Sequence, residues 1–292
     1  MEKVRIGMIS CGGNARHHMY LLSRIAEAQV VALCDPDVRQ IELAKAAYPH
    51  LADVPTFSDY KKMLSEVEMD AVEISTPHTQ HVDQILDAFD AGLHVQCEKP
   101  LVTSTKDAIR VIQARDKCGK VGLLAYQRHT TAEHAWIREV CKSGKLGKPT
   151  MFNASLGQEW KQLTIGSWRQ DPALSGGGQL NDSGSHVIDL MLWVMGVRAS
   201  VVSALIDNRG TPVDVNSAVC VKFDSGAMGN ITIVGDAPCW QEDISFWFEK
   251  GALLLRNGKL TMQDEAGTHF AIDNIRGGSS PDANFINAIL GR

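Results

Sequence analysis

The sequence predicts an α/β fold whose first half is a doubly wound parallel sheet. Short apolar stretches of strand length alternate with amphipathic helical segments from residue 4 to residue 125. This alternation is typical of units in which a helix connects two parallel strands. The length of 292 residues is enough for about two domains.

The predicted elements of the first half follow one another regularly. Each strand is an apolar run that stops at a polar residue, a glycine or a proline, and each helix repeats its apolar residues at helical spacing. Gly92 is the expected C-terminal stop of the fourth helix. The expected strands are residues 4–9, 29–34, 70–75, 93–97 and 121–125, and the expected helices are residues 15–26, 41–47, 60–67, 81–91 and 105–117.

The loop after the first predicted strand has the spacing of a dinucleotide-binding loop. Ser10, Gly12 and Ala15 stand at the three positions of the G-x-G-x-x-G/A pattern, between a strand and a helix. Gly12 lets the backbone approach a pyrophosphate, and the N-terminus of the next helix favours its negative charge. Ser10 replaces the first glycine of the pattern, and Gly13 offers a second flexible position.

Asp35 ends the second predicted strand, 25 residues after Ser10. A carboxylate at this point accepts hydrogen bonds from the ribose hydroxyls and repels a 2′-phosphate, which favours NAD over NADP. The alternative is that Asp35 is a turn residue before Pro36.

Two more strands end in polar segments, Thr76-Pro77-His78 and Glu98-Lys99-Pro100. Ligands of doubly wound sheets bind beyond the carboxyl ends of the strands, so both segments are expected at the cofactor crevice. Pro100 keeps Lys99 out of the helical region. The ammonium of Lys99 can therefore hydrogen-bond a substrate hydroxyl and stabilise alkoxide character. The alternative is a surface lysine at the end of a strand.

The stretch from Ser175 to Asp189 is the main candidate for catalysis. It holds three consecutive glycines, 176–178, followed by Asp182 and His186. On a helix that begins near Ser183, residues four apart share one face, and Asp189 lies on the same side. A carboxylate that holds an imidazole is a common general base. The alternative is that Asp182 caps a core helix and that His186 is structural.

Composition excludes several other classes of protein. Hydrophobic residues make up 44% and charged residues 22% of the chain, with a formal net charge of −5. No basic stripe indicates nucleic-acid binding, and no apolar run is long enough for a membrane span. The N-terminus leads directly into a strand, without a signal-peptide pattern. Seven scattered cysteines without metal-binding spacing favour a reducing cytoplasm and predict no metal site.

Five segments together carry a resemblance to a known family. They occur in the order IGMISCGGNA, LCDPD, ISTPHTQH, AGLHVQCEKPL and SGGGQLNDSGSHVIDL. In this combination the chain resembles, over roughly residues 4–260, the glucose–fructose oxidoreductase / inositol dehydrogenase (Gfo/Idh/MocA) family of NAD(P)-dependent sugar and polyol oxidoreductases.

The resemblance implies an NAD-binding Rossmann domain at residues 1–125. Residues 126–292 would form a substrate-binding and oligomerisation α/β domain with a large open, mostly antiparallel sheet. The sequence agrees, because residues 224–226 and 257–258 are hairpin turn signals between apolar runs. The expected strands there are residues 150–156, 201–206, 218–223, 227–234, 244–248 and 252–255. A homo-oligomer, a dimer or tetramer joined through this sheet, is expected.

The resemblance also implies roles for individual residues. The family's catalytic lysine, aspartate and histidine fall on Lys99, Asp182 and His186, which would also bind the substrate. Whether His186 or Lys99 is the primary base stays open. The cofactor would be bound by Ser10, Cys11, Gly12, Gly13, Asn14, Ala15, Asp35, Thr76, Pro77, His78, His81, Glu98 and Lys99. The other expected substrate ligands are Tyr126, Arg128, Trp160, Trp168 and Arg169, for which core packing and a surface ion pair are the alternatives.

The leading hypothesis is an NAD-dependent dehydrogenase that acts on a secondary alcohol of a sugar, a sugar derivative or a cyclic polyol. A redox-neutral glycosidase or lyase with tightly held NAD is a second hypothesis. A non-catalytic cofactor-binding relative is a third, although such relatives lose the lysine or the Asp/His pair. Family members usually continue beyond a segment like residues 281–290 with a helix that packs on the Rossmann domain. If that helix is absent, part of the domain's surface would be left uncovered.

Overall fold

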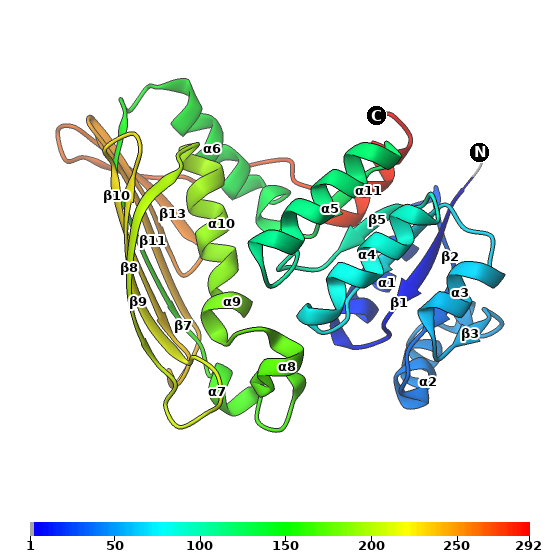
Figure 1. Ribbon diagram of the computed structural model, residues 1–292. Coiled ribbons are helices and arrows are strands. Elements are labelled where there is room, and N and C mark those ends of the chain that lie inside the picture. Colours follow the sequence, from blue (N-terminus) through cyan, green and yellow to red (C-terminus); the bar gives the residue numbers. More distant parts are fainter. Residues whose placement is uncertain (1–2) are drawn as a thin grey trace. The chain divides into compact units, whose positions relative to one another are not determined.

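The computed structural model describes residues 3–292, which fold into two compact units (Figure 1). One unit consists of residues up to 127 together with residues 279–292, and the other of residues 128–278. The first unit is therefore assembled from two separate parts of the chain. No helix within residues 3–292 combines the length and the apolar character needed to cross a membrane.

The first unit contains a fully parallel sheet whose six strands, among the described residues, run in the order β3-β2-β1-β4-β5-β6. This order is the doubly wound topology that the alternating pattern predicts. Strand β3 has only two residues and was not predicted. The strands are β1 (Val4–Ile9), β2 (Ala28–Cys34), β3 (Thr56–Phe57), β4 (Ala71–Ile74), β5 (His94–Cys97) and β6 (Gly122–Leu124).

Helices cover both faces of this sheet and form two apolar cores with it. Residues of α1, α2 and α11 build one core, and residues of α3, α4 and α5 build the other. Gly92 has a φ of 75° directly after α4, as expected for the residue that stops a helix. The helices are α1 (Gly13–Ser23), α2 (Val38–Ala47), α3 (Tyr60–Glu66), α4 (His81–Asp90), α5 (Thr105–Cys118) and α11 (Pro281–Ile289).

Helix α11 belongs to the first unit, whereas the sequence analysis assigned its residues to the second domain. Ser280 caps the helix through the backbone N–H of Ala283, and Pro281 occupies its first turn. Phe285 and Ile286 are each 1% exposed and lie in the core that α1 lines. The helix contacts α1, β5 and β6.

The second unit is built on one open sheet with the strand order β14-β13-β12-β11-β7-β10-β9-β8 among its described residues. All neighbouring strands are antiparallel except β7 and β10, which confirms the expected mostly antiparallel sheet. The predicted turns at residues 224–226 and 257–258 connect β9 to β10 and β12 to β13. The strands are β7 (Pro149–Gly157), β8 (Ala199–Asp207), β9 (Asn216–Phe223), β10 (Met228–Val234), β11 (Gln241–Phe248), β12 (Gly251–Arg256), β13 (Lys259–Asp264) and β14 (His269–Ala271).

Helices α10 and α6 pack together on one face of this sheet (Figure 1). Val187, Leu190, Met191 and Val194 of α10 face the sheet at helical spacing and are almost fully buried. The helices of the unit are α6 (Ala132–Ser143), α7 (Trp160–Leu163), α8 (Pro172–Ser175), α9 (Gln179–Asp182) and α10 (Gly184–Met195). Short 3-10 helices lie at Pro49–Leu51, His78–Gln80, Gln127–His129 and Trp168–Gln170.

Candidate active site

The loop between β1 and α1 has the shape of an anion cradle. Ser10 adopts a φ of 99°, the region that favours glycine, at the position where the fingerprint has its first glycine. Its hydroxyl accepts a hydrogen bond from the N–H of Gly12 at 3.1 Å. The N-terminus of α1 has no side-chain cap, and a Cβ on Gly13 would meet no atom within 4 Å. The first amides of α1 can therefore approach a pyrophosphate, so this loop fits a dinucleotide.

Asp35 is held against this loop at the end of β2. Its Oδ2 accepts a hydrogen bond from the N–H of Cys11 at 2.8 Å, and its Oδ1 accepts one from the N–H of Asp37 at 2.9 Å. The side chain is 8% exposed. A carboxylate fixed in this way keeps lone pairs for ribose hydroxyls and opposes a second negative charge. Burial, with the charge of Asp35, raises the pKa of the Cys11 thiol to about 12, so Cys11 stays neutral.

His81 lies deeper than the sequence analysis expected. It is fully buried, and each of its ring nitrogens lies 2.9 Å from a backbone carbonyl oxygen, that of Pro100 or that of Thr76. Burial lowers its pKa, although the hydrogen bonds to the carbonyls of Pro100 and Thr76 oppose this shift. This corrects the expectation that His81 contacts the cofactor. It braces the segments that follow β4 and β5, and His78 packs edge-on against its ring.

Lys99 follows β5 at the carboxyl edge of the sheet, where the sequence places it. Its side chain is 9% exposed, and its backbone N–H donates to Oε2 of Glu98 at 3.0 Å. Thr76 lies at the end of the neighbouring strand and donates from its hydroxyl to Oε1 of Gln84 at 2.5 Å. Tyr126 follows β6 and donates its backbone N–H to the carbonyl of Leu124.

In the second unit, a tight turn leads into α9. Gly178 runs so close to Asp214 that a Cβ would lie 1.9 Å from its carbonyl oxygen, so only glycine fits there. The carboxylate of Asp214 accepts hydrogen bonds from the N–H groups of Gly178 at 2.6 Å and Leu180 at 2.7 Å. Sequence reasoning missed Asp214, because nothing near it in the chain indicates that it caps a helix 34–36 residues earlier.

Asp182 ends α9, and His186 lies in the first turn of α10. Asp182 is 5% exposed, and its Oδ2 accepts hydrogen bonds from Nε1 of Trp160 at 2.9 Å and from Nε of Arg169 at 3.0 Å. Asp189, expected on the side of His186, has its Oδ2 atom 2.7 Å from Nε2 of His129.

The aromatic residues of the loop before α9 have different positions. Trp160 is 2% exposed and packs against Val213 and Val215, so it supports Asp182 and does not present its face to a substrate as expected. Trp168 lies under the guanidinium of Arg169, with 4.5 Å between the guanidinium carbon and the ring centre. This contact holds Arg169 in place while part of its side chain stays exposed.

Arg128 is also buried, and it forms an ion pair with Glu242 of β11. Its Nη1 atom is buried without a hydrogen-bond partner among residues 3–292. Arg128 therefore retains a donor beyond its ion pair, consistent with the expected role in ligand binding.

Comparisons with known proteins agree with this geometry. Residues 4–126 match a family model described as "Oxidoreductase family, NAD-binding Rossmann fold", and residues 134–254 match the GFO/IDH/MocA C-terminal domain. The levoglucosan dehydrogenase of Pseudarthrobacter phenanthrenivorans is 24% identical over 81% of this chain and 69% of its own length. The inositol 2-dehydrogenase of Streptomyces avermitilis is 29% identical over 65% of this chain and 52% of its own length.

The fold is also found among solved structures. The WlbA dehydrogenase of Bordetella pertussis, in complex with NADH and UDP-GlcNAcA, has a TM-score of 0.81 at 23% identity, covering 98% of this chain and 84% of that one. Its likeness shows the fold. With both of its domains matched by models of one family, the chain belongs to the Gfo/Idh/MocA oxidoreductase family and carries its NAD-binding Rossmann domain.

Proposed function

We propose that the protein is an NAD-dependent oxidoreductase that transfers a hydride between a secondary alcohol and the nicotinamide. The alcohol would belong to a sugar, a sugar derivative or a cyclic polyol. The observation that carries the proposal is the cofactor loop, with its uncapped helix N-terminus and with the carboxylate of Asp35 bound to the N–H of Cys11. The names of the two curated relatives, a levoglucosan and an inositol dehydrogenase, support the substrate class.

NAD, when bound, accepts the hydride from the alcohol carbon. The residues that would hold it lie in the β1–α1 loop and at the ends of β2, β4 and β5. Asp35 would accept hydrogen bonds from the ribose hydroxyls, and the amides at the start of α1 would face the pyrophosphate. The proposed set is Ser10, Cys11, Gly12, Gly13, Asn14, Ala15, Asp35, Thr76, Pro77, His78, Glu98 and Lys99.

In the proposed reaction His186 takes the hydroxyl proton. Lys99 donates a hydrogen bond to the same oxygen and stabilises its developing negative charge. Asp182, held by Arg169 and Trp160, orients the base and stabilises its protonated form. Tyr126, Arg128, Trp168 and Arg169 are proposed to contact the substrate. Removing a positioned acid or base costs roughly 10²- to 10⁴-fold in rate.

The test is an assay of the purified protein with NAD or NADP against free sugars, inositols, sugar acids and aryl glycosides. The proposal expects NADH absorbance to rise with at least one free sugar or polyol. The rise should be lost in Lys99→Ala and His186→Ala. Release of an aglycone without accumulating NADH would contradict it in favour of the redox-neutral glycosidase. A rise in NADH absorbance that both variants retain would contradict the catalytic roles assigned to Lys99 and His186.

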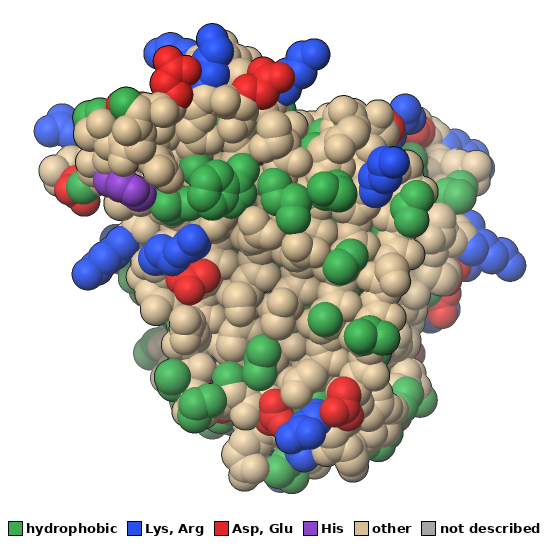
Figure 2. Space-filling model, turned by 90° about the vertical axis from the view of Figure 1, so that its left-hand side faces the viewer, with side chains coloured by type: hydrophobic (Ala, Val, Ile, Leu, Met, Phe, Trp, Pro, Cys, Tyr) green, Lys and Arg blue, Asp and Glu red, His purple; other side chains and the backbone are tan. Residues whose placement is uncertain are grey.

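We propose that the protein is a homo-oligomer joined through the sheet of the second unit. Strand β8 lies at the edge of this sheet, and Val201, Val202, Leu205 and Ile206 are 55–79% exposed, on both of its faces. Figure 2 looks at the side of the molecule where this sheet lies, and hydrophobic side chains are exposed across it. A flat apolar sheet edge is a surface that proteins usually cover, so a second copy of the sheet suits it.

We also propose that the protein works in the cytoplasm. Cys11, Cys34 and Cys97 are buried thiols in or beside the Rossmann strands, where they pack as small apolar side chains. Free thiols of this kind suit a reducing compartment.

A further inference from the structure

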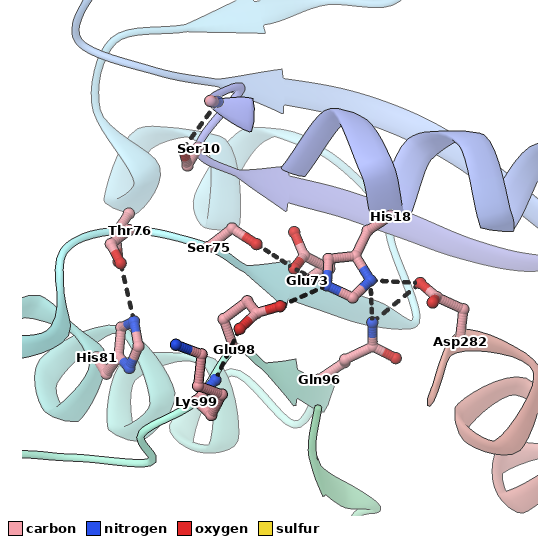
Figure 3. Close-up of polar contacts among 11 residues, drawn as sticks. Ser10, His18, Glu73, Ser75, Thr76, His81, Gln96, Glu98, Lys99 and Asp282 are labelled. Atoms are coloured by element: carbon pink, nitrogen blue, oxygen red, sulfur yellow. Dashed lines mark hydrogen bonds and ion pairs between the residues drawn. The ribbon is translucent and has the colours of Figure 1, made fainter. Parts of the chain in front are cut away.

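A buried polar cluster joins four parts of the first unit. We call it the His18 cluster; it consists of His18 on α1, Glu73 on β4, Gln96 on β5, Glu98 after β5 and Asp282 on α11 (Figure 3). His18, Glu73, Gln96 and Asp282 are at most 3% exposed. Burying several carboxylates costs free energy unless a cation compensates them, so the cluster is more than packing.

The ring of His18 bridges two carboxylates. Its Nδ1 lies 2.9 Å from Oδ1 of Asp282, and its Nε2 lies 3.1 Å from Oε1 of Glu98. Each ring nitrogen therefore faces a carboxyl oxygen, an arrangement that favours a ring protonated on both nitrogens, and Nε2 of Gln96 also lies 3.1 Å from Nδ1. Burial lowers the pKa of His18, but the charges and hydrogen bonds of Glu73, Asp282 and Glu98 outweigh it and raise that pKa well above its ordinary value. His18 is therefore an imidazolium.

Glu98 contacts both His18 and the backbone of Lys99. While Oε1 of Glu98 accepts from His18, Oε2 accepts from the backbone N–H of Lys99 at 3.0 Å. Burial raises the pKa of Glu98, but the hydrogen bond and the charge of His18, with Lys99, outweigh it, so Glu98 stays ionised. The carboxylate is thus fixed on both sides, between the imidazolium and the main chain of the proposed catalytic lysine.

We propose that His18 is a positioning residue for Lys99. The imidazolium compensates the charge of Glu98 and holds that carboxylate on the backbone N–H of Lys99. The ammonium of Lys99 is therefore directed to the substrate oxygen and not to Glu98. Without the imidazolium, the partly buried carboxylate of Glu98 loses its compensating charge, and the ammonium of the next residue, Lys99, can take its place. The inference rests on the proposed function, since it assigns Lys99 its catalytic role.

Asp282 and Gln96 orient the ring. Nε2 of Gln96 donates to Oδ1 of Asp282 at 3.0 Å, the oxygen that also faces His18 Nδ1. Helix α11 is in this way connected to β5. Asp282→Asn keeps the shape and one acceptor, so it should reproduce the effect of a His18 substitution in weaker form.

The first experiment compares His18→Gln with His17→Gln. His17 is the neighbouring residue on α1 and is exposed, so it controls for the substitution itself. In His18→Gln, kcat should fall roughly 10- to 100-fold, the cost of a misplaced catalytic group, while KM for NAD stays unchanged. Circular dichroism checks that both variants are folded at the assay temperature. An unchanged kcat together with a lower Tm would mean that His18 is only structural and would overturn the proposal.

A rescue separates charge compensation from packing. Glu98→Gln removes the charge that His18 compensates, so His18→Gln should cost less in the Glu98→Gln background than in the wild type. Equal losses in both backgrounds would overturn the proposal.

A readout without turnover keeps the inference separate from the proposed function. Nitrogen NMR of the histidine rings should show both nitrogens of His18 protonated at about pH 8, above the ordinary pKa of histidine. The titratable groups that face the ring are Glu73, Glu98 and Asp282, and the ring of His17 lies edge-on to it with 6.1 Å between the ring centres. The backbone amide signal of Lys99 should move in His18→Gln and stay in place in His17→Gln. If the wild type reduces no NAD with any substrate, the proposed function fails, and these two signals still decide the inference: a neutral His18 ring or an unmoved Lys99 amide overturns it.

Discussion

The Oδ2 atom of Asp182 accepts a hydrogen bond from the guanidinium Nε of Arg169 at 3.0 Å, and the carboxylate is almost fully buried. The same oxygen accepts the indole N–H of Trp160. Two donors on one oxygen restrict the orientation of the Asp182 carboxylate. This is the side chain that we propose orients His186.

Arg169→Ala should therefore lower kcat about tenfold or more, because Asp182 loses its charged partner inside a buried site. Trp160→Phe removes only the N–H donor and should have a smaller effect. Since both donors act on one atom, the double variant should lose less than the two single losses combined. Steady-state kinetics of the three variants check this. Arg198→Ala is the matched control, since Arg198 forms an exposed ion pair with Asp224 in the same unit. Losses that simply add would show that the two donors act independently.

Asp35→Ser should relax discrimination against NADP. The substitution removes the negative charge that would oppose a 2′-phosphate, so kcat/KM with NADP should rise relative to that with NAD. Asp37→Ser is the control, because Asp37 is a helix-capping residue two positions on, and serine caps equally well. A ratio that does not change in Asp35→Ser would count against Asp35 as the ribose ligand.

Ser10→Gly should be more stable than Ser10→Ala by about 1–2 kcal/mol. Both substitutions remove the hydroxyl that binds the N–H of Gly12, so that loss cancels in the comparison. Only glycine relieves the cost of a φ of 99°. Urea unfolding of the two variants measures the difference. Equal stability would mean that the backbone at this position relaxes.

Glu73→Gln should stabilise the protein near neutral pH. Burial raises the pKa of Glu73 to about 7, although the charge of His18 and the hydrogen bond from Ser75 oppose this rise. An acid whose pKa is higher in the folded state loses its proton more easily when unfolded, so it lowers stability as pH rises from its unfolded value of 4.5 to about 7.

Glutamine at position 73 mimics the protonated acid and removes this dependence of stability on pH. The free energy of unfolding should therefore be equal in the wild type and in Glu73→Gln near pH 4.5. Above about pH 7 it should be larger in Glu73→Gln by roughly 1–3 kcal/mol. Denaturant unfolding across that range is the measurement. A variant that is less stable at every pH would show that Glu73 is needed as an anion.

Leu205→Asp should reduce the oligomeric state. Leu205 is 79% exposed on the edge strand β8, and a charge at the centre of the proposed contact would have to be buried. Light scattering after gel filtration gives the mass. Leu43→Asp, at a 52% exposed leucine on α2, is the control and should leave the mass unchanged. A wild-type protein that runs as a monomer would refute the proposed interface.

Local motifs in the sequence were enough to predict the sheet of the first unit and the loop that is proposed to bind the dinucleotide. Each strand between 4 and 97 that was predicted is present, because its apolar run is buried on both faces and so has a strong signal. Strand β3, with two residues, is too short to have any periodicity. Six strands of the second sheet were predicted from their apolar runs, together with the Asp-Ser-Gly and Asn-Gly turns, whereas β13 and β14 were not predicted.

Contacts between distant residues could not be predicted. Phe285 and Ile286 define an apolar helix face, but a face of this kind suits any partner, so the sequence did not show that α11 packs in the first unit and its residues were assigned to the second domain. Nothing near Asp214 indicates that it caps α9, and nothing near Trp160 indicates that its N–H meets Asp182. The burial of His81 was missed because a histidine beside a cofactor loop looks the same in sequence whether it binds a ligand or two carbonyl groups.

The contact between His18 and Asp282 spans 264 residues of the chain. During synthesis, the Rossmann sheet emerges from the ribosome long before the helix that completes it. Until then the nascent sheet carries an open apolar site for Phe285 and Ile286, and its buried acids lack their final arrangement. The intervening unit, residues 128–278, must be made first. Phe285 and Ile286 can therefore close the core beside α1 only after the whole intervening unit has been translated.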